Sequence, residues 1–166
     1  MSLNSIYTPE EIEGFLNNGF PQDFNQWGQA DSEGITVAHR AAVHRRLPRG
    51  FDQWALATPF GWTVAHEAVQ KGLLPLTFDQ WHLSTVNGIS VAHTAAENGT
   101  FPNNFNRWGL QDSEGRTVAH YAAEFGYLPS DFNQWDLVDN EGQTVRDITE
   151  DAKKFVEKQR SIGPKC

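Results

Sequence analysis

Four histidines recur in register, each 27 residues after the one before it: His39, His66, His93 and His120. Histidine is the usual metal ligand and general base near neutral pH, so the pattern first suggests a metal or catalytic site. Equivalent residues of stacked helices lie roughly 8 to 10 Å apart, however, whereas a metal ion needs its nitrogen ligands at about 2 Å. We therefore expect structural histidines, each hydrogen-bonded to a helix cap or to a neighbouring loop.

The remaining sequence offers no arrangement typical of catalysis. It holds no glycine-rich nucleotide-binding motif, and no serine or cysteine is arranged with a histidine as a nucleophile would be. The single cysteine, Cys166, can form neither an internal disulfide nor a cysteine-based zinc site. The sequence therefore predicts no catalytic residue, no metal and no cofactor, and a protein that is not an enzyme.

The histidines belong to an internal repeat whose other fixed positions are mostly aromatic, proline or glycine. A fixed period in this range predicts a solenoid, in which each unit buries its apolar face only against its neighbours. The repeated aromatic residues are expected to fill the interfaces between units; they are Phe24, Phe51, Phe78, Phe105 and Phe132, and Trp27, Trp54, Trp81, Trp108 and Trp135.

Each repeat is expected to contain two short helices. Thr36 and its equivalents place a hydroxyl N-cap before Val-Ala-His-x-Ala-Ala, and a glycine such as Gly72 closes this helix, although the first copy has Arg45 there. The following Leu-Pro can begin a second helix, in which Phe and Trp three residues apart share one face. The predicted fold class is all-α, a solenoid of helix-turn-helix repeats with short loops and a helical cap at each end.

The two ends of the chain differ from the repeats, as the exposed ends of a solenoid should. We expect one domain over residues 1–166, with an N-terminal cap over residues 1–19 and repeats over about 20–142. Thr8-Pro9-Glu10-Glu11 is typical of a helix start. An amphipathic closing helix is predicted over about 143–160, with its apolar residues facing inward: Ile148, Ala152, Phe155 and Val156.

The motif Thr-Val-Ala-His-x-Ala-Ala, with an upstream Asp-x-x-Gly and a downstream Gly, resembles the ankyrin repeat, whose signature carries Thr-Pro-Leu-His at this place. The resemblance covers residues 31 to about 147. Two departures are Val-Ala in place of Pro-Leu and a 27-residue period in place of roughly 33. The resemblance implies a protein–protein interaction module that binds a partner through its concave face and loop tips. It also implies an intracellular adaptor in the cytoplasm, or a translocated bacterial effector in the cytosol of a host cell.

Positions that vary between copies are the candidates for partner contacts. By the resemblance they lie beside each loop glycine and after each Ala-Ala pair. The residues predicted to bind a partner are Ile35, Val43, His44, Phe60, Trp62, Lys71, Val86, Ile89, Arg116 and Phe125. The strongest hint is Pro59-Phe60-Gly61-Trp62, because it replaces an acidic turn and holds the only tryptophan outside the repeat register. The alternative is that Phe60 and Trp62 fold back onto the adjacent loop.

The net charge of the chain restricts the class of partner. The chain carries 13 basic and 21 acidic residues, a formal charge of −8, which argues against nucleic acid. No apolar run is long enough to span a membrane. We expect a monomer that binds another protein. Two alternatives stay open: a small-ligand or enzymatic site, marked by a pocket joining His44, Arg45, Trp62 and Lys71, and an acidic mimic that inhibits a nucleic-acid-binding protein.

A basic spot interrupts the acidic surface near the first repeat helix. Residues 40–49 hold four arginines and no acid: Arg40, Arg45, Arg46 and Arg49. Such a spot could bind a carboxylate or a phosphorylated segment of a partner. The alternative is a solvated face that neutralises its acidic neighbours.

Overall fold

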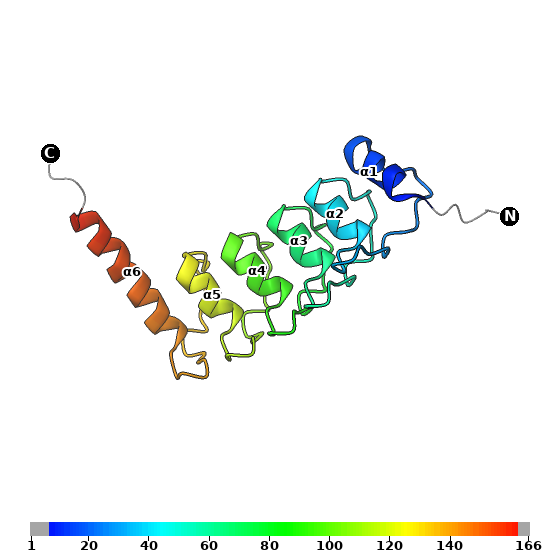
Figure 1. Cartoon of the computed structure of the whole chain (residues 1–166). Helices are drawn as coiled ribbons and strands as arrows, with labels where there is room; N and C mark the ends of the chain where they lie inside the picture. The colour runs from blue at the N-terminus through cyan, green and yellow to red at the C-terminus, as the bar shows by residue number, and fades with distance from the viewer. Residues whose placement is uncertain (1–6, 163–166) are drawn as a thin grey trace. The chain divides into compact units, whose positions relative to one another are not determined.

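The fold is all-α. The computed structural model describes residues 7–162, and the side chains of residues 7–158. These residues form six helices and isolated bridges but no strand (Figure 1). The chain divides into two compact units, Met1–Val86 and Asn87–Cys166, which we describe separately.

The first unit contains three helices that lie side by side: α1 (Pro9–Asn18), α2 (Val37–Val43) and α3 (Val64–Gln70). The predicted start of α1 is confirmed. Thr8 caps the helix with its side chain, and Glu11 returns a bond to the Thr8 amide, which together form a capping box. Arg40 pairs with Glu13, and Arg46 donates to the Asn17 carbonyl at 2.8 Å, so two of the four clustered arginines hold α1 against α2.

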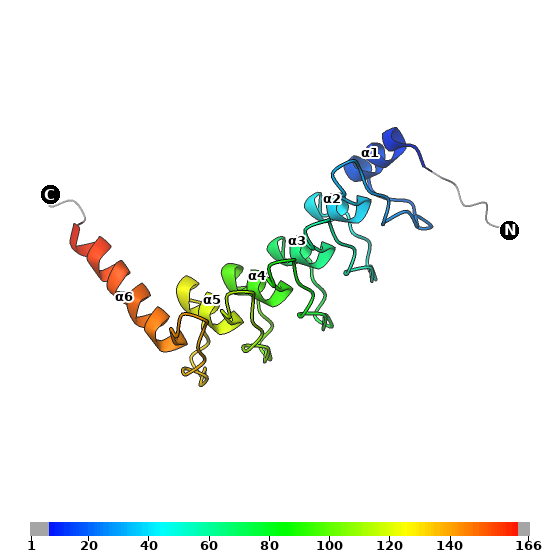
Figure 2. The same cartoon turned by 60° about the horizontal axis from the view of Figure 1, so that its bottom comes forward.

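The second unit contains α4 (Val91–Asn98), α5 (Val118–Phe125) and α6 (Val145–Ile162). Helix α5 contacts both α4 and α6. Since α6 has 18 residues and α5 has 8, α6 begins beside α5 and continues past its end (Figures 1 and 2). The predicted closing helix is confirmed, and it begins at Val145, two residues after the predicted start.

The prediction of a second helix in each repeat is wrong. In each repeat the segment from the proline to the tryptophan forms turns. These turns lie on one side of the helices within each unit (Figure 2). The Phe24 amide bonds the Pro21 carbonyl three residues back, at 3.1 Å, and the equivalent phenylalanines repeat this bond. The Trp27 carbonyl accepts instead from Ala38 in the next helix, at 3.0 Å. The carbonyl of the residue that would end a second helix therefore stabilises the start of the following helix.

The aromatic residues nevertheless form the core that the repeat predicts. In the first unit Phe24 packs edge-on against Trp27, with ring centroids 4.6 Å apart, and Trp27 packs against Phe51 at 5.5 Å. In the second unit Trp108 lies 5.5 Å from Phe132, again edge-on. Side chains of Trp27, Trp54, Trp81 and Trp108 are all buried. Trp135 and Phe105 are half-buried, so four of the five repeat tryptophans and four of the five repeat phenylalanines lie in the core as predicted.

The histidines link one repeat to the next within each unit, and this confirms their predicted structural role. The backbone amide of Ser90 donates to His93 Nδ1 at 3.0 Å, and the Ser90 hydroxyl lies 2.7 Å from the same nitrogen. Nδ1 is therefore an acceptor, which places the proton on Nε2. His93 Nε2 lies 3.1 Å from the Arg116 carbonyl, and His39 Nε2 lies 2.9 Å from the Trp62 carbonyl.

Candidate functional site

The predicted contact residues fall into two groups, one in each unit. Seven belong to the first unit and three to the second, namely Ile89, Arg116 and Phe125. Phe60 keeps 74% of its side chain exposed, and Val86 keeps 69%. Val43, His44 and Phe125 are also exposed, whereas Ile35, Trp62, Lys71, Ile89 and Arg116 are half-buried.

In the first unit the structure brings the loop tips that carry Phe60 and Val86 together. The Val86 amide donates to the Phe60 carbonyl at 3.0 Å. The contact is close enough that a side chain at Gly61 would lie 2.8 Å from the Thr85 Cα atom, so glycine is required there. Two exposed apolar side chains thus lie on adjoining turns.

Trp62 folds back, but onto the helix that follows it and not onto the adjacent loop, whereas Phe60 stays exposed. The Trp62 ring lies 4.8 Å from that of His66, and its indole N–H donates to Glu67 at 3.4 Å. Glu67 also pairs with Lys71 at 3.8 Å. Trp62 and Lys71 therefore converge on one carboxylate of α3 and offer less free surface than Phe60.

The pocket that would mark a small-ligand site does not join its four predicted residues. A cavity of about 680 Å³ includes Arg45, between the turns that carry Phe51 and Phe78. Its lining includes neither His44 nor Trp62 nor Lys71. Among the described residues no group of three His, Cys, Asp or Glu side chains could hold a metal ion.

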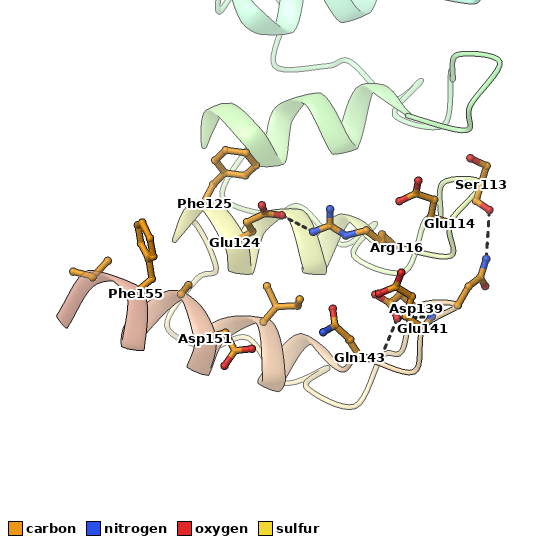
Figure 3. Close-up of a pocket in the computed structure, with 14 residues that line it drawn as sticks. Ser113, Glu114, Arg116, Glu124, Phe125, Asp139, Glu141, Gln143, Asp151 and Phe155 are labelled. Carbon is orange, nitrogen blue, oxygen red and sulfur yellow. Dashed lines mark hydrogen bonds and ion pairs between the residues drawn. The ribbon is translucent and has the colours of Figure 1, made fainter. Parts of the chain in front are cut away.

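The second unit holds a larger concavity, a groove of about 1000 Å³ between α5 and α6 (Figure 3). Two predicted residues, Arg116 and Phe125, line it, but Ile89 does not. Residues of two turns lie at one end of the groove, among them Ser113, Glu114, Asp139 and Glu141 (Figure 3). The residues that line it are Ser113, Glu114, Arg116, Glu124, Phe125, Asp139, Asn140, Glu141, Gln143, Ile148, Asp151, Ala152, Phe155 and Val156.

Helix α6 supplies the apolar wall of the groove, and here the sequence prediction needs correction. Ile148 and Ala152 are half-buried, but Phe155 is 63% exposed and Val156 48% exposed. At about 1.5 Å per residue, Phe155 lies about 15 Å along α6, whereas α5 is only about 12 Å long. Phe155 and Val156 therefore extend past the helix that was expected to cover them.

The two aromatic side chains and the loop carboxylates occupy different ends of the groove, while Glu124 and Asp151 lie nearer the aromatic end (Figure 3). Figure 3 shows Phe125 and Phe155 at one end and Glu114, Asp139 and Glu141 at the other. The lining holds five carboxylates and one guanidinium, that of Arg116. The groove is therefore a strongly acidic surface with an aromatic end.

Arg116 is already engaged by its own unit. It pairs with Glu124 on α5, and its guanidinium carbon lies 4.8 Å from the centre of the Tyr121 ring. The Tyr121 hydroxyl donates to Asp112 at 2.9 Å, and burial together with this bond raises the pKa of Tyr121 far above its usual value. Burial also raises the pKa of Glu97, and the nearby Glu124 raises it further. Negative charge thus dominates around the single cation.

Some exposed apolar residues carried no signal in the sequence. Leu76, at a turn of the first unit, is 97% exposed, and Tyr127 and Val138 are about half exposed. Leu76 lies beside the repeated proline, where the copies differ, and only that variability could have drawn attention to it.

The described part of the chain includes no helix long and apolar enough to cross a membrane. The sequence matches no protein-family model and no curated protein sequence.

Proposed function

We propose that this protein is a non-enzymatic protein-binding module, built as a solenoid of ankyrin-like repeats, that acts in the cytoplasm. The observation that carries the proposal is the groove between α5 and α6, because Phe125 and Phe155 are exposed together at its open end. Adjacent exposed aromatic side chains mark interaction surfaces more often than ordinary surface, and aromatic residues are frequent binding hot spots.

The repeat pattern supports a recognition role over a packing role for Phe125. The equivalent residues of the other repeats are His44, Lys71 and Asn98, all polar, so the fold does not need an aromatic residue at this position. A rigid repeat presents such variable side chains at fixed places, which limits the entropy lost on association.

Affinity capture from a lysate of the source organism tests this proposal. Phe125→Asn/Phe155→Gln removes the aromatic end of the groove, and Leu76→Gln is the control because Leu76 is fully exposed outside it. We expect at least one captured protein to be lost with the groove variant and retained with the control, while both variants keep the wild-type unfolding midpoint.

A third variant, Phe60→Gln/Val86→Ser, removes the apolar loop tips of the first unit. A partner lost only with this variant would move the binding surface to those loops. If every captured protein persists with both double variants, neither surface binds a partner and the proposed function is wrong.

A further inference from the structure

We infer that the groove between α5 and α6 binds one amphipathic helix of a partner protein, whose apolar face is flanked by lysine or arginine residues. This inference rests on the proposed function and specifies the chemistry of the partner segment.

The groove is large enough to hold two turns of a helix. A helix about 10 Å wide that rises 1.5 Å per residue occupies about 120 Å³ per residue, so about 1000 Å³ holds roughly eight residues, or two turns. Addition of a β-strand would need an exposed sheet edge, and the described residues of this unit form only isolated bridges. A helix placed in the groove could pack against α5 and α6 together.

The walls of the groove specify an amphipathic helix. Ile148 and Ala152 form a half-buried floor on α6, and Phe125, Phe155 and Val156 stand exposed at its open end. Apolar residues of the ligand at positions i, i+3, i+4 and i+7 would cover these side chains, which is how a helix is recognised in a groove.

The charges of the groove specify the polar face of the ligand. The only cation in the lining, Arg116, already pairs with Glu124. Asp139 is buried and accepts from the Glu141 and Gln143 amides at 2.9 Å, and Asp151 pairs with Lys154 at 3.1 Å. Glu114 and Glu141 remain as exposed carboxylates at the loop end. Cationic side chains complement this rim, whereas an acidic segment would be repelled.

Three fluorescent peptides of about fourteen residues test the inference against the full chain by anisotropy. The first places leucines on one helical face and lysines elsewhere, the second replaces each lysine by glutamate, and the third shuffles the lysine peptide so that no apolar face remains. We expect the lysine peptide to bind at least about tenfold more tightly than either of the others, with an affinity that falls as salt is added.

Charge-reversal variants locate the binding. Glu114→Lys/Glu141→Lys should weaken the lysine peptide about tenfold, because it reverses both exposed rim charges. Asp131→Lys/Glu150→Lys makes the same change in net charge at exposed positions outside the groove lining, so it should retain the wild-type affinity. Lysine is compatible with the fold at 114 and 141, since the equivalent residues Phe60 and Asn87 already differ from glutamate.

Five results would overturn the inference. Equal binding of the shuffled peptide would show general attraction to an acidic protein, and equal weakening by both reversal variants would show the same. Tighter binding of the glutamate peptide would refute the charge assignment; if Phe125→Asn/Phe155→Gln abolished that binding, the proposed function would survive. Absence of binding by all three peptides would refute the helix in the groove, while lysate capture would still decide the proposed function. Sedimentation as a dimer that Phe155→Gln converts to a monomer would assign the groove to a second copy of the chain.

Discussion

The histidine at the third helical position offers a direct test of how the repeats are held together. His93 is fully buried, and its two ring nitrogens reach the Ser90 amide at 3.0 Å, the Ser90 hydroxyl at 2.7 Å and the Arg116 carbonyl at 3.1 Å. His93→Leu introduces an apolar side chain of similar size and removes all three hydrogen bonds of the histidine ring. The variant therefore isolates the polar contribution of the histidine from its packing.

The expected cost follows from the groups that lose their partner. The Ser90 amide and hydroxyl are buried and lose His93 Nδ1 as acceptor, although the hydroxyl oxygen still accepts from the backbone amide of residue 93 at 3.3 Å. Each buried donor left unsatisfied costs about 1–3 kcal/mol. Loss of the bond to the Arg116 carbonyl adds about 1 kcal/mol, and the apolar leucine recovers part of the total. We expect His93→Leu to lower the free energy of unfolding by about 3–5 kcal/mol.

Urea unfolding followed by far-UV circular dichroism measures this loss. His82→Leu is the control, because His82 is exposed and its replacement should change the free energy by less than about 0.5 kcal/mol. A double-mutant cycle with Ser90→Ala should give a coupling energy of at least about 1 kcal/mol. A loss below about 1 kcal/mol in His93→Leu, or a coupling energy near zero, would refute the view that these histidines stabilise the stack through hydrogen bonds.

Three further predictions concern pH, packing and backbone conformation. Burial lowers the pKa of His39 and His93 below the usual value of 6.5, so the unfolded chain takes up protons first on acidification. Urea titrations should therefore give full stability above about pH 6.5 and a decline below it, with a shallower decline in His93→Leu; an unchanged slope would contradict this. Trp81→Ala should cost about 3–5 kcal/mol in thermal unfolding and the half-buried Trp62→Ala clearly less, so equal losses would contradict the distinction between them. Arg45 has a φ of 57°, where the other described repeats have glycine, so Arg45→Gly should raise the unfolding free energy by about 1 kcal/mol, and a lower melting temperature would count against this.

The sequence predicted the local features of the fold because their causes are local. Hydroxyl N-caps such as Thr63 and closing glycines such as Gly99 act on backbone groups a few residues away, and the aromatic register repeats without interruption. The absence of the second helix could not be predicted in this way, since a proline followed by Phe and Trp three residues apart is compatible with a helix and with turns alike.

The candidate site was predicted only in part, for a similar reason. Arg116 and Phe125 were identified because they vary between copies. The pattern of α6 showed which residues share a face, but it could not show that α5 ends before Phe155, which depends on the lengths of two packed helices. In the first unit, the sequence left open whether Trp62 is exposed or folds back onto the adjacent loop, and it did not predict that the ring lies against His66.

The backbone bonds at the start of each repeat helix also bear on anions. In α5 the first two amides, those of Val118 and Ala119, donate to the Leu110 and Trp108 carbonyls at 3.0 and 3.1 Å, and α2 and α3 repeat the arrangement. The third amide is taken by the hydroxyl cap. Helix starts often bind phosphate because their amides have no other acceptor. At these three helices a phosphate would have to displace carbonyl groups that already accept from the first amides. The positive end of each helix dipole is therefore satisfied by the preceding segment of the same chain and is not free to bind an anion.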